Sequence, residues 1–286
     1  MTMKKMPVPS DPIRQFQDEV ERNLDALAKA RGLQTQSLQW LADTLEYRYS
    51  YNFNWLGRPI IQYPQDMVAI QELIWRTRPE LIVETGVAHG GSLILSASML
   101  ALLDYCDGLP ASQPVEALPT PRQVIGIDVD IRAHNRAAIE AHPLARKITL
   151  IEGSSVSSDV AAEVRERARR HGRVMVILDS NHTHEHVLGE LKLYAPLVSR
   201  DSYCVVFDTV IEELPEGSFT GRPWSRGNSP MTAVRVFLSS LETEATAAAD
   251  GMRLLFEVDS RIDAKLLIST APRGYLRRVI APAPSR

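Results

Sequence analysis

Five short apolar segments that alternate with helical patterns constrain the fold of this sequence more than any other feature. They cover residues 81–83, 124–127, 148–151, 174–178 and 203–207. Strands that are separated by helices are joined by crossover connections, so they run parallel in one sheet with helices on both faces. The alternation therefore predicts an α/β protein with a Rossmann-like, mostly parallel sheet.

Residues 1–64 follow a different pattern, and we expect them to form an N-terminal helical extension to a domain that covers residues 65–286. Apolar residues recur at helical spacing between positions 12 and 46. An aromatic segment, residues 47–55, comes next. This segment is either ordinary packing, a lid over a site, or a contact with another subunit, and the sequence leaves these alternatives open.

Each of the five strands ends in polar residues, and ligands in such sheets bind beyond the carboxyl ends of the strands. The strand-end residues are Glu84, Asp128, Glu152-Gly153-Ser154, Asp179 and Asp208. A carboxylate at the edge of a sheet must be solvated, paired or bound to a metal. Their shared position at one rim predicts a functional site there.

The turn after the first strand contains several glycines, which allow a tight turn and a close approach of the backbone to a ligand. It reads Glu84-Thr85-Gly86-Val87-Ala88-His89-Gly90-Gly91-Ser92, which is not the spacing of a dinucleotide-binding turn. An acidic first residue suits a cationic ligand better than a pyrophosphate. S-adenosylmethionine (SAM) carries an amino group and a sulfonium, so we expect SAM to bind here. The other interpretation is a turn without a ligand.

Two further strand ends are candidates for binding the rest of this cofactor. Asp128 can accept hydrogen bonds from both ribose hydroxyls, and Asp130 is a weaker candidate for that role. Ser154 and Ser155 are expected to lie beside the adenine ring of the cofactor. Alternatively, these two serines cap the helix that is expected to begin at residue 156.

The segment that follows the fourth strand carries three histidines, His182, His184 and His186. A helix that starts at residue 183 would point these rings in different directions, so we expect one functional histidine, His182, as a general base. Asp179 and Asp208 end neighbouring strands and are expected to share one Mg²⁺ ion, which prefers carboxylates and waters. The alternative is a polar rim without an ion.

Composition argues against several classes of partner. The formal net charge is −3, so nothing points to nucleic acid or to an anionic membrane. Cys106 and Cys204 lie far apart without metal-binding spacing, which favours reduced thiols. We find neither a secretory signal nor a run of about 18 apolar residues, and therefore expect a cytoplasmic protein without a membrane span.

Two other patterns concern the surface and the C-terminal part of the chain. The arginines at positions 165, 167, 169, 170 and 173 are interpreted as a solvated helix face rather than a functional patch. Segments 265–269 and 275–280 flank Pro272-Arg273-Gly274 and are expected to form a closing hairpin.

Taken together, these segments resemble the cephalosporin hydroxylase/rhamnosyl O-methyltransferase family of class I methyltransferases over roughly residues 60–280. The resemblance lies in segments 83–92, 124–128, 178–182, 205–208 and 274–279. It implies a class I methyltransferase fold that binds SAM at Glu84, Gly86, Asp128 and Ser154. It also implies Mg²⁺ at Asp179 and Asp208, with His182 as the base.

The same resemblance implies methyl transfer to a hydroxyl of a sugar or of a glycosylated small molecule. Trp224 in the long loop 209–230 is a candidate for stacking on a sugar ring, with Arg222 and Arg226 beside it. Members of the family often carry a Glu-Asp pair after the fifth strand, whereas this chain has Phe207-Asp208. Asn181 or Glu212 would have to supply the missing ligand.

Two alternatives to a methyltransferase stay open at this point. One is a nicotinamide-dependent oxidoreductase on a similar sheet, which the acidic Glu84 argues against. The other is a non-catalytic accessory protein of a biosynthetic pathway, which the Phe207 departure favours. A homo-oligomer is plausible for each of these functions.

Overall fold

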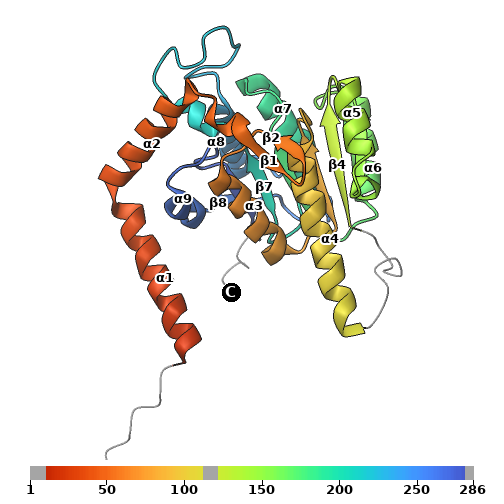
Figure 1. Ribbon diagram of the computed structural model, residues 1–286, viewed down its shortest axis with the longest axis horizontal. Coiled ribbons are helices and arrows are strands. Elements are labelled where there is room, and N and C mark those ends of the chain that lie inside the picture. The colour runs from red at the N-terminus through yellow and green to blue at the C-terminus, as the bar shows by residue number, and fades with distance from the viewer. Residues whose placement is uncertain (1–10, 112–121, 281–286) are drawn as a thin grey trace, which may run out of the picture.

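The computed structural model describes residues 11–111 and 122–280, and a seven-stranded sheet lies at its centre (Figure 1). The strand order is β5-β4-β3-β6-β7-β9-β8. The strands are β3 (Leu81–Thr85), β4 (Gln123–Asp128), β5 (Ile148–Glu152), β6 (Val174–Leu178), β7 (Tyr203–Val206), β8 (Phe256–Val258) and β9 (Tyr275–Arg278). The first five are parallel, and β9 runs antiparallel between β7 and β8. The expected Rossmann-like, mostly parallel sheet is confirmed.

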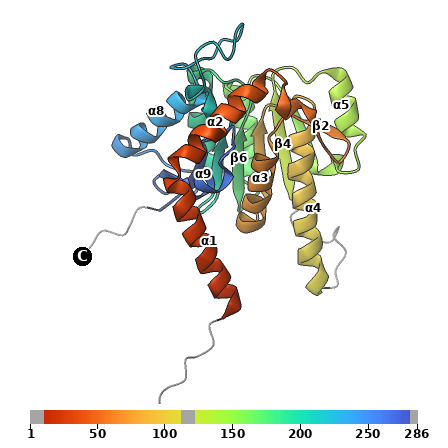
Figure 2. The same cartoon turned by 60° about the vertical axis from the view of Figure 1, so that its left-hand side comes forward.

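Helices cover both faces of this sheet, as Figure 2 shows for α3 and α4 in front of the strands. On one face lie α3 (Pro64–Thr77), α4 (Gly91–Ala111), α5 (Ala133–Glu140) and α9 (Ser260–Leu266). On the other face lie α6 (Ser158–Ala168), α7 (His184–Tyr194) and α8 (Pro230–Thr243). Because both faces are covered, the central strands are apolar on both sides, with β3 and β6 buried throughout.

The prediction of a closing hairpin is wrong for its first strand, at residues 265–269, whereas its second strand is found as β9. Residues 260–266 form helix α9, whose Ile262 and Leu266 are buried against the sheet. Asp259 accepts a hydrogen bond from Arg261 N at 3.2 Å and so caps the start of this helix. The antiparallel partners of β9 are therefore β7 and β8, because the chain between residues 259 and 274 leaves the sheet.

Helix α4 also corrects an expectation about apolar segments. Its residues Gly91–Leu109 are long and apolar enough to cross a membrane by length and composition. However, 56% of the most apolar stretch is buried inside the molecule, where Leu93, Leu100 and Leu103 are fully covered. The first half of the helix packs in the core, whereas Leu102, Tyr105 and Leu109 in its second half are exposed. Its apolar composition is thus explained in part by packing against the sheet.

The N-terminal extension consists of α1 (Pro12–Lys29), α2 (Arg31–Leu45), the short helix η1 (Tyr49–Asn52) and the hairpin β1 (Phe53–Trp55) and β2 (Arg58–Ile60). Figure 1 shows α1 projecting beyond the sheet, and none of its residues is buried. By contrast, the hairpin packs on α4, where Trp55 Nε1 donates a hydrogen bond to Ser98 Oγ at 3.0 Å. The division between an extension and a domain at residue 64 stays a prediction.

Helix α2 and the aromatic segment pack over the carboxyl end of the sheet. Leu41 of α2 is buried in a small cluster with Tyr63, Val210 and Leu214. Tyr49 packs against neighbouring rings, with its centroid 5.1 Å from Trp40 and 5.5 Å from Tyr63. These contacts place the extension over the rim where the polar strand ends meet.

Candidate active site

A cavity of about 520 Å³ opens at the carboxyl ends of the central strands. Its walls come from the N-terminal extension, the turn after β3, the segment after β6, and the region from residue 208 to the loop 209–230. Representative lining residues are Leu41, Tyr51, Tyr63, Gly86, His89, Gly90, Gly91, Ser92, Asp179, His182, Asp208 and Trp224. Four segments that are far apart in the sequence therefore meet around one space.

The turn after β3 is shaped by Gly86 and fixed by Asp128. Gly86 has a φ of +90°, and a Cβ at this position would overlap the carbonyl oxygen of Asp179. The Asp128 carboxylate accepts hydrogen bonds from Val87 N at 2.8 Å and from Ala88 N at 3.3 Å. Asp128 thus holds the turn, and since a carboxylate can accept about four hydrogen bonds, it retains capacity for a ligand hydroxyl.

Two residues that the sequence analysis missed also support this turn. Arg58 donates a hydrogen bond to the His89 carbonyl at 2.6 Å and another to Asn135 Oδ1 at 3.1 Å. Asn135 in turn donates to the Ala88 carbonyl at 2.9 Å. Neither residue belongs to a motif, and no sequence pattern joins them to the turn, so only the tertiary structure reveals this role.

Replacing Gly86 by alanine is expected to destabilise the protein by more than about 3 kcal/mol, because the new Cβ meets backbone that cannot move aside. Gly57→Ala is the matched control, since Gly57 has a similar φ of +86° with nothing within 4 Å of an added Cβ. We expect that control to cost about 1 kcal/mol. Urea unfolding of both variants measures the difference, and equal losses would contradict the role assigned to crowding at Gly86.

Glu84 lies beneath the cavity rather than in its wall. Its side chain is only 1% exposed, and Ser96 Oγ donates a hydrogen bond to it at 3.5 Å. Burial raises the pKa of Glu84 to about 7, although hydrogen bonds from Ser92 and Ser96 oppose the shift. A small internal space lined by Glu84, Ser92 and Asp179 joins this carboxyl group to the floor of the active-site region.

Asp179, His182 and Asp208 form the chemical centre of the cavity. One ligand atom from each lies within 4.8 Å of the others, which is close enough for all three to hold one metal ion. His182 Nε2 lies 3.1 Å from Asp208 Oδ2. Burial, followed by the nearby carboxylates of Asp208 and Glu84, raises the pKa of Asp179 well above its usual range.

Gln62 is another residue that the sequence analysis missed, and it contacts this cluster directly. Its Nε2 donates a hydrogen bond to Asp179 Oδ2 at 2.8 Å. Its Oε1 is buried and has no partner among the described residues. A buried oxygen without a donor is costly, so this atom indicates that a donor or a cation belongs nearby.

The loop 209–230 brings Trp224 to the same cluster. The Trp224 ring lies edge-on to His182, with a centroid distance of 4.6 Å, and Arg222 lies 5.2 Å from the indole centroid. Glu212 anchors the loop by accepting hydrogen bonds from Gly227 N at 2.9 Å and Ser229 Oγ at 2.7 Å. Trp224 and Arg222 therefore form one wall of the cavity, whereas Arg226 donates to the Glu212 carbonyl and does not line it.

The other two histidines have different partners. His184 Nδ1 lies 2.7 Å from Thr232 Oγ1 on α8. His186 Nε2 lies 3.3 Å from Glu190 Oε1, which is fully buried. The histidine-rich segment is thus divided between the cavity and two structural contacts.

The serines after β5 lie away from the cavity wall. Ser155 is buried and donates a hydrogen bond to Glu190 Oε1 at 2.5 Å. Neither Ser154 nor Ser155 caps the following helix, as one interpretation held, because α6 begins at residue 158 and Ser157 accepts the hydrogen bond from Val160 N. Ser154 is half-buried at the same strand end.

The position of Phe207 explains how the chain accommodates an apolar residue beside Asp208. Its side chain is 4% exposed and belongs to the core beneath the active site. The two substitutes considered for a third oxygen ligand are engaged elsewhere. Asn181 Oδ1 accepts hydrogen bonds from Thr183 N and Oγ1, and Glu212 anchors the loop. Within the described residues, His182 is the group that completes the cluster.

The residues of this site lie in a segment with known relatives. A sequence model of the Rhamnosyl O-methyltransferase/CmcI family matches residues 47–279. This chain belongs to that family. The match includes the glycine turn, the segment 179–182 and Asp208, so the resemblance inferred from the sequence is confirmed.

Individual family relatives match over shorter stretches. The rhamnosyl O-methyltransferase of Mycobacterium leprae (strain TN) is 27% identical over 164 residues, which is 56% of this chain and 62% of the relative. The rhamnosyl O-methyltransferase of Mycobacterium tuberculosis is 29% identical over 154 residues, which is 52% of this chain and 54% of the relative. This chain therefore spans little more than half the length of these relatives.

Two solved structures match this chain at a lower level of similarity. An apo-structure of CmcI has a TM-score of 0.47 and 22% sequence identity, covering 81% of this chain and 78% of that chain. The MycE methyltransferase from the mycinamycin biosynthetic pathway, solved with Mg, SAH and mycinamycin VI, has a TM-score of 0.46 and 18% identity. That match covers 86% of this chain and 57% of MycE.

Proposed function

We propose that this protein is a SAM-dependent, Mg²⁺-assisted O-methyltransferase that acts on a hydroxyl of a sugar or of a glycosylated small molecule. The observation that carries the proposal is the meeting of the glycine turn with Asp179, His182 and Asp208 around one cavity. Membership of the Rhamnosyl O-methyltransferase/CmcI family supports it. The names of the mycobacterial relatives support a sugar as the acceptor.

The residues around the glycine turn fit a small cationic cofactor. SAM supplies an electrophilic methyl group, and its amino group matches the buried carboxyl of Glu84 in charge. The turn lines the cavity from Gly86 to Ser92, and Asp128 retains hydrogen-bonding capacity for a ribose hydroxyl. The proposed cofactor-binding residues are Glu84, Gly86, His89, Gly90, Gly91, Ser92 and Asp128. A contact of Ser154 and Ser155 with the adenine ring stays a prediction, since neither lines the cavity and Ser155 is engaged by Glu190.

The cluster beside this turn fits a hard divalent cation. Asp179 and Asp208 are carboxylates, and burial together with the nearby carboxylates of Asp208 and Glu84 raises the pKa of Asp179, so a bound cation would favour its ionised form. The unpaired Oε1 of Gln62 is a further oxygen next to Asp179. Mg²⁺ at Asp179 and Asp208 would make a bound hydroxyl easier to deprotonate.

His182 is placed to accept the proton of the acceptor hydroxyl. Its Nε2 faces Asp208, which stabilises the imidazolium that forms, and Trp224 limits the orientations of the ring. The wall formed by Trp224 and Arg222 suits a polar ring such as a sugar. Most of the rate enhancement would come from holding the acceptor oxygen and the methyl donor in line.

Calorimetric titration of the full chain with SAM, with and without Mg²⁺, is the first test of this proposal. We expect micromolar binding in at least one condition, and then Mg²⁺-dependent methyl transfer to rhamnosyl or other sugar acceptors. Absence of SAM binding in both conditions would contradict the proposal and favour the accessory-protein alternative. Binding of NAD(H) in place of SAM would favour the oxidoreductase alternative.

SAM affinity is expected to rise by up to about tenfold as pH increases through 7, since only ionised Glu84 attracts the cationic cofactor. Affinity rises rather than falls with pH because burial raises the pKa of Glu84 to about 7. The carboxyl group is therefore mostly protonated one unit below that pH and mostly ionised one unit above it. Titrations at both pH values measure the change. Glu84→Gln should bind SAM weakly at both, and an unchanged pH dependence in this variant would exclude Glu84 as its source.

Two further proposals concern the location of the protein in the cell and the role of the N-terminal extension. We place the protein in the cytoplasm, where SAM is available. We also propose that the extension serves as a lid through α2 and as a contact between copies through α1, whose Ile13 and Phe16 are 70% and 66% exposed. Light scattering of the full chain and of a chain that begins at residue 31 tests the second proposal.

A further inference from the structure

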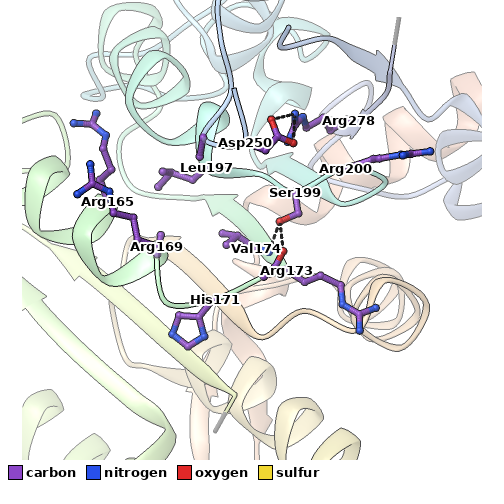
Figure 3. A pocket seen from close by; sticks show the side chains of 13 residues that line it. Arg165, Arg169, His171, Arg173, Val174, Leu197, Ser199, Arg200, Asp250 and Arg278 are labelled. Atoms are coloured by element: carbon purple, nitrogen blue, oxygen red, sulfur yellow. Dashed lines mark hydrogen bonds and ion pairs between the residues drawn. The ribbon is translucent and has the colours of Figure 1, made fainter. Parts of the chain in front are cut away.

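A second cavity, of about 540 Å³, lies at the amino ends of the central strands, opposite to the active site at their carboxyl ends. It is bounded by the amino end of β6 at Val174, the carboxyl end of α6, the segment 197–200 before β7, and the end of β9 at Arg278 (Figure 3). Strand β6 separates the two sites, because Val174 begins this strand and Asp179 directly follows it. The second cavity therefore has no part in the proposed methyl transfer.

The lining of this cavity is strongly basic. Its arginines are Arg165, Arg169, Arg173, Arg200 and Arg278. Figure 3 shows Arg165 and Arg169 on one side and Arg173 and Arg200 on the other, with Ser199 between them. Arg165 and Arg173 make no side-chain hydrogen bond or ion pair with any residue that the structure describes. Two free guanidinium groups thus stand on opposite sides of one hollow.

The only carboxylate among the lining residues is already neutralised. Asp250 accepts two hydrogen bonds from Arg278, at 2.7 and 2.8 Å, and Arg278 also donates to the Val198 carbonyl at 2.7 Å. This pairing lowers the pKa of Asp250, so the carboxylate stays ionised and compensates Arg278. Of the other four arginines, Arg169 pairs with Glu166 at 2.8 Å and Arg200 with Asp201 at 3.4 Å, both acids lying outside the lining. Arg165 and Arg173 are the two whose charge no described carboxylate pairs with.

Two buried polar atoms in the lining lack partners within the described part of the chain. The side chain of Arg278 is 4% exposed, and its Nε makes no hydrogen bond. His171 Nδ1 is buried in the same way and is equally unpaired. Both atoms are buried in the wall of the cavity, so a ligand in the open space would bind to the exposed arginines rather than to these two atoms.

We propose that this cavity binds a small molecule that carries a diphosphate group. Guanidinium groups bind phosphate oxygens in a bidentate manner, and arginines on two sides match an anion with two phosphoryl groups. Val174 and Leu197 give the floor an apolar surface that suits the organic part of a nucleoside diphosphate. The recessed shape and the net charge of −3 favour a small ligand over a nucleic acid.

This proposal revises the interpretation of the arginine run as a solvated helix face. Arg167 fits the earlier interpretation, since it pairs with Glu163 on the exposed side of α6 at 2.8 Å. Arg165 and Arg173 instead line the cavity without a partner among the described residues, and Arg169 lines it while pairing with Glu166 at 2.8 Å. The sequence spacing could not separate the two groups, because their difference depends on the neighbouring segments 197–200 and 249–250.

The test is calorimetric titration of the full chain with inorganic pyrophosphate in buffer without Mg²⁺. The double variant Arg165→Gln/Arg169→Gln is expected to weaken binding at least tenfold relative to the wild type. The matched control, Arg167→Gln/Arg170→Gln, removes the same charge from the same region outside the cavity and should change the affinity less than twofold. Thermal unfolding of both variants checks that they are folded.

A parallel titration with ADP distinguishes the two sources of a diphosphate. Tighter binding of ADP than of pyrophosphate, sensitive to Arg165 and Arg169, identifies a nucleoside diphosphate, and equal binding identifies the inorganic anion. The proposal is overturned if neither probe binds at millimolar concentration or if both double variants weaken binding equally. Binding of a DNA oligonucleotide without binding of pyrophosphate would also overturn it. None of these readouts depends on methyl transfer, so the result is independent of the proposed activity.

Discussion

Asp179→Asn is expected to lower kcat for methyl transfer at least about a hundredfold while the affinity for SAM stays within about twofold. The amide keeps the shape of the side chain and can still contact Gln62, which lies 2.8 Å from Asp179 Oδ2. It removes the negative charge that the proposed cation needs. Initial rates at saturating SAM, with Mg²⁺ varied, measure the effect. Glu185→Gln, at an exposed position in the first turn of α7, is the matched control and should leave the rate unchanged.

The same substitution should stabilise the metal-free protein at neutral pH. Burial raises the pKa of Asp179 in the folded state, so its contribution to stability is fully present below the unfolded pKa and is lost as pH rises through the folded pKa. Asparagine does not ionise, so the variant avoids the loss of stability that ionisation of the buried Asp179 causes. Thermal unfolding should therefore show a higher midpoint for Asp179→Asn without Mg²⁺, and a smaller increase on adding Mg²⁺ than in the wild type. A lower midpoint without Mg²⁺, together with full activity, would contradict the proposed metal site.

The sequence predicts the central strands well because their signal is local. Each of β3, β4, β5, β6 and β7 is a short apolar run between turn residues, and each is found within two residues of its expected bounds. The order of the strands in the sheet depends on which face each connecting helix packs against, and no local residue pattern predicts that order. Strand β8 was missed because Phe256–Val258 has only three residues, one of them charged. Helix α9 was missed because its last residues were assigned to a strand expected at 265–269.

Residues of the candidate site divide in the same way. Asp179, His182 and Asp208 could be chosen from the sequence, since strand ends of a parallel sheet share one edge. Gln62 and Arg58 could not, because each reaches its partner across more than 30 positions from an extension with no motif. The sequence thus reveals site residues at the ends of the repeated strands, whereas residues that tertiary packing brings to the site are seen only in the structure.

The structure also shows why a residue type alone does not establish a ligand contact. Asp128 was chosen as an acceptor for ribose hydroxyls, yet its hydrogen bonds to Val87 N and Ala88 N give it a structural task in the same turn. Gly86 was chosen for its close approach to a ligand, and the atom that an added Cβ would meet first is the backbone carbonyl oxygen of Asp179. The close approach at Gly86 places the glycine turn directly against Asp179, so the two halves of the proposed site pack on each other.

His182→Ala is expected to reduce kcat by about 10² to 10⁴, the range for loss of a positioned general base, with little change in SAM affinity. His184→Ala is the matched control, because His184 belongs to the same segment but pairs with Thr232 on α8 at 2.7 Å. The control should keep most of the activity, although it loses one structural hydrogen bond. Steady-state rates of both variants, with calorimetric SAM titrations, test the prediction.

A second readout separates the two tasks that the geometry allows for His182. Its Nε2 lies 3.1 Å from Asp208 Oδ2 and within the cluster that could hold a cation, so the ring could serve as a base or as a metal ligand. If His182 is the base, the alanine variant should recover part of its rate at high pH, where hydroxyl deprotonation needs less help, and its Mg²⁺ affinity should be unchanged. If the ring is a ligand, Mg²⁺ affinity should fall and high pH should not restore the rate. Full activity in the alanine variant would exclude both roles.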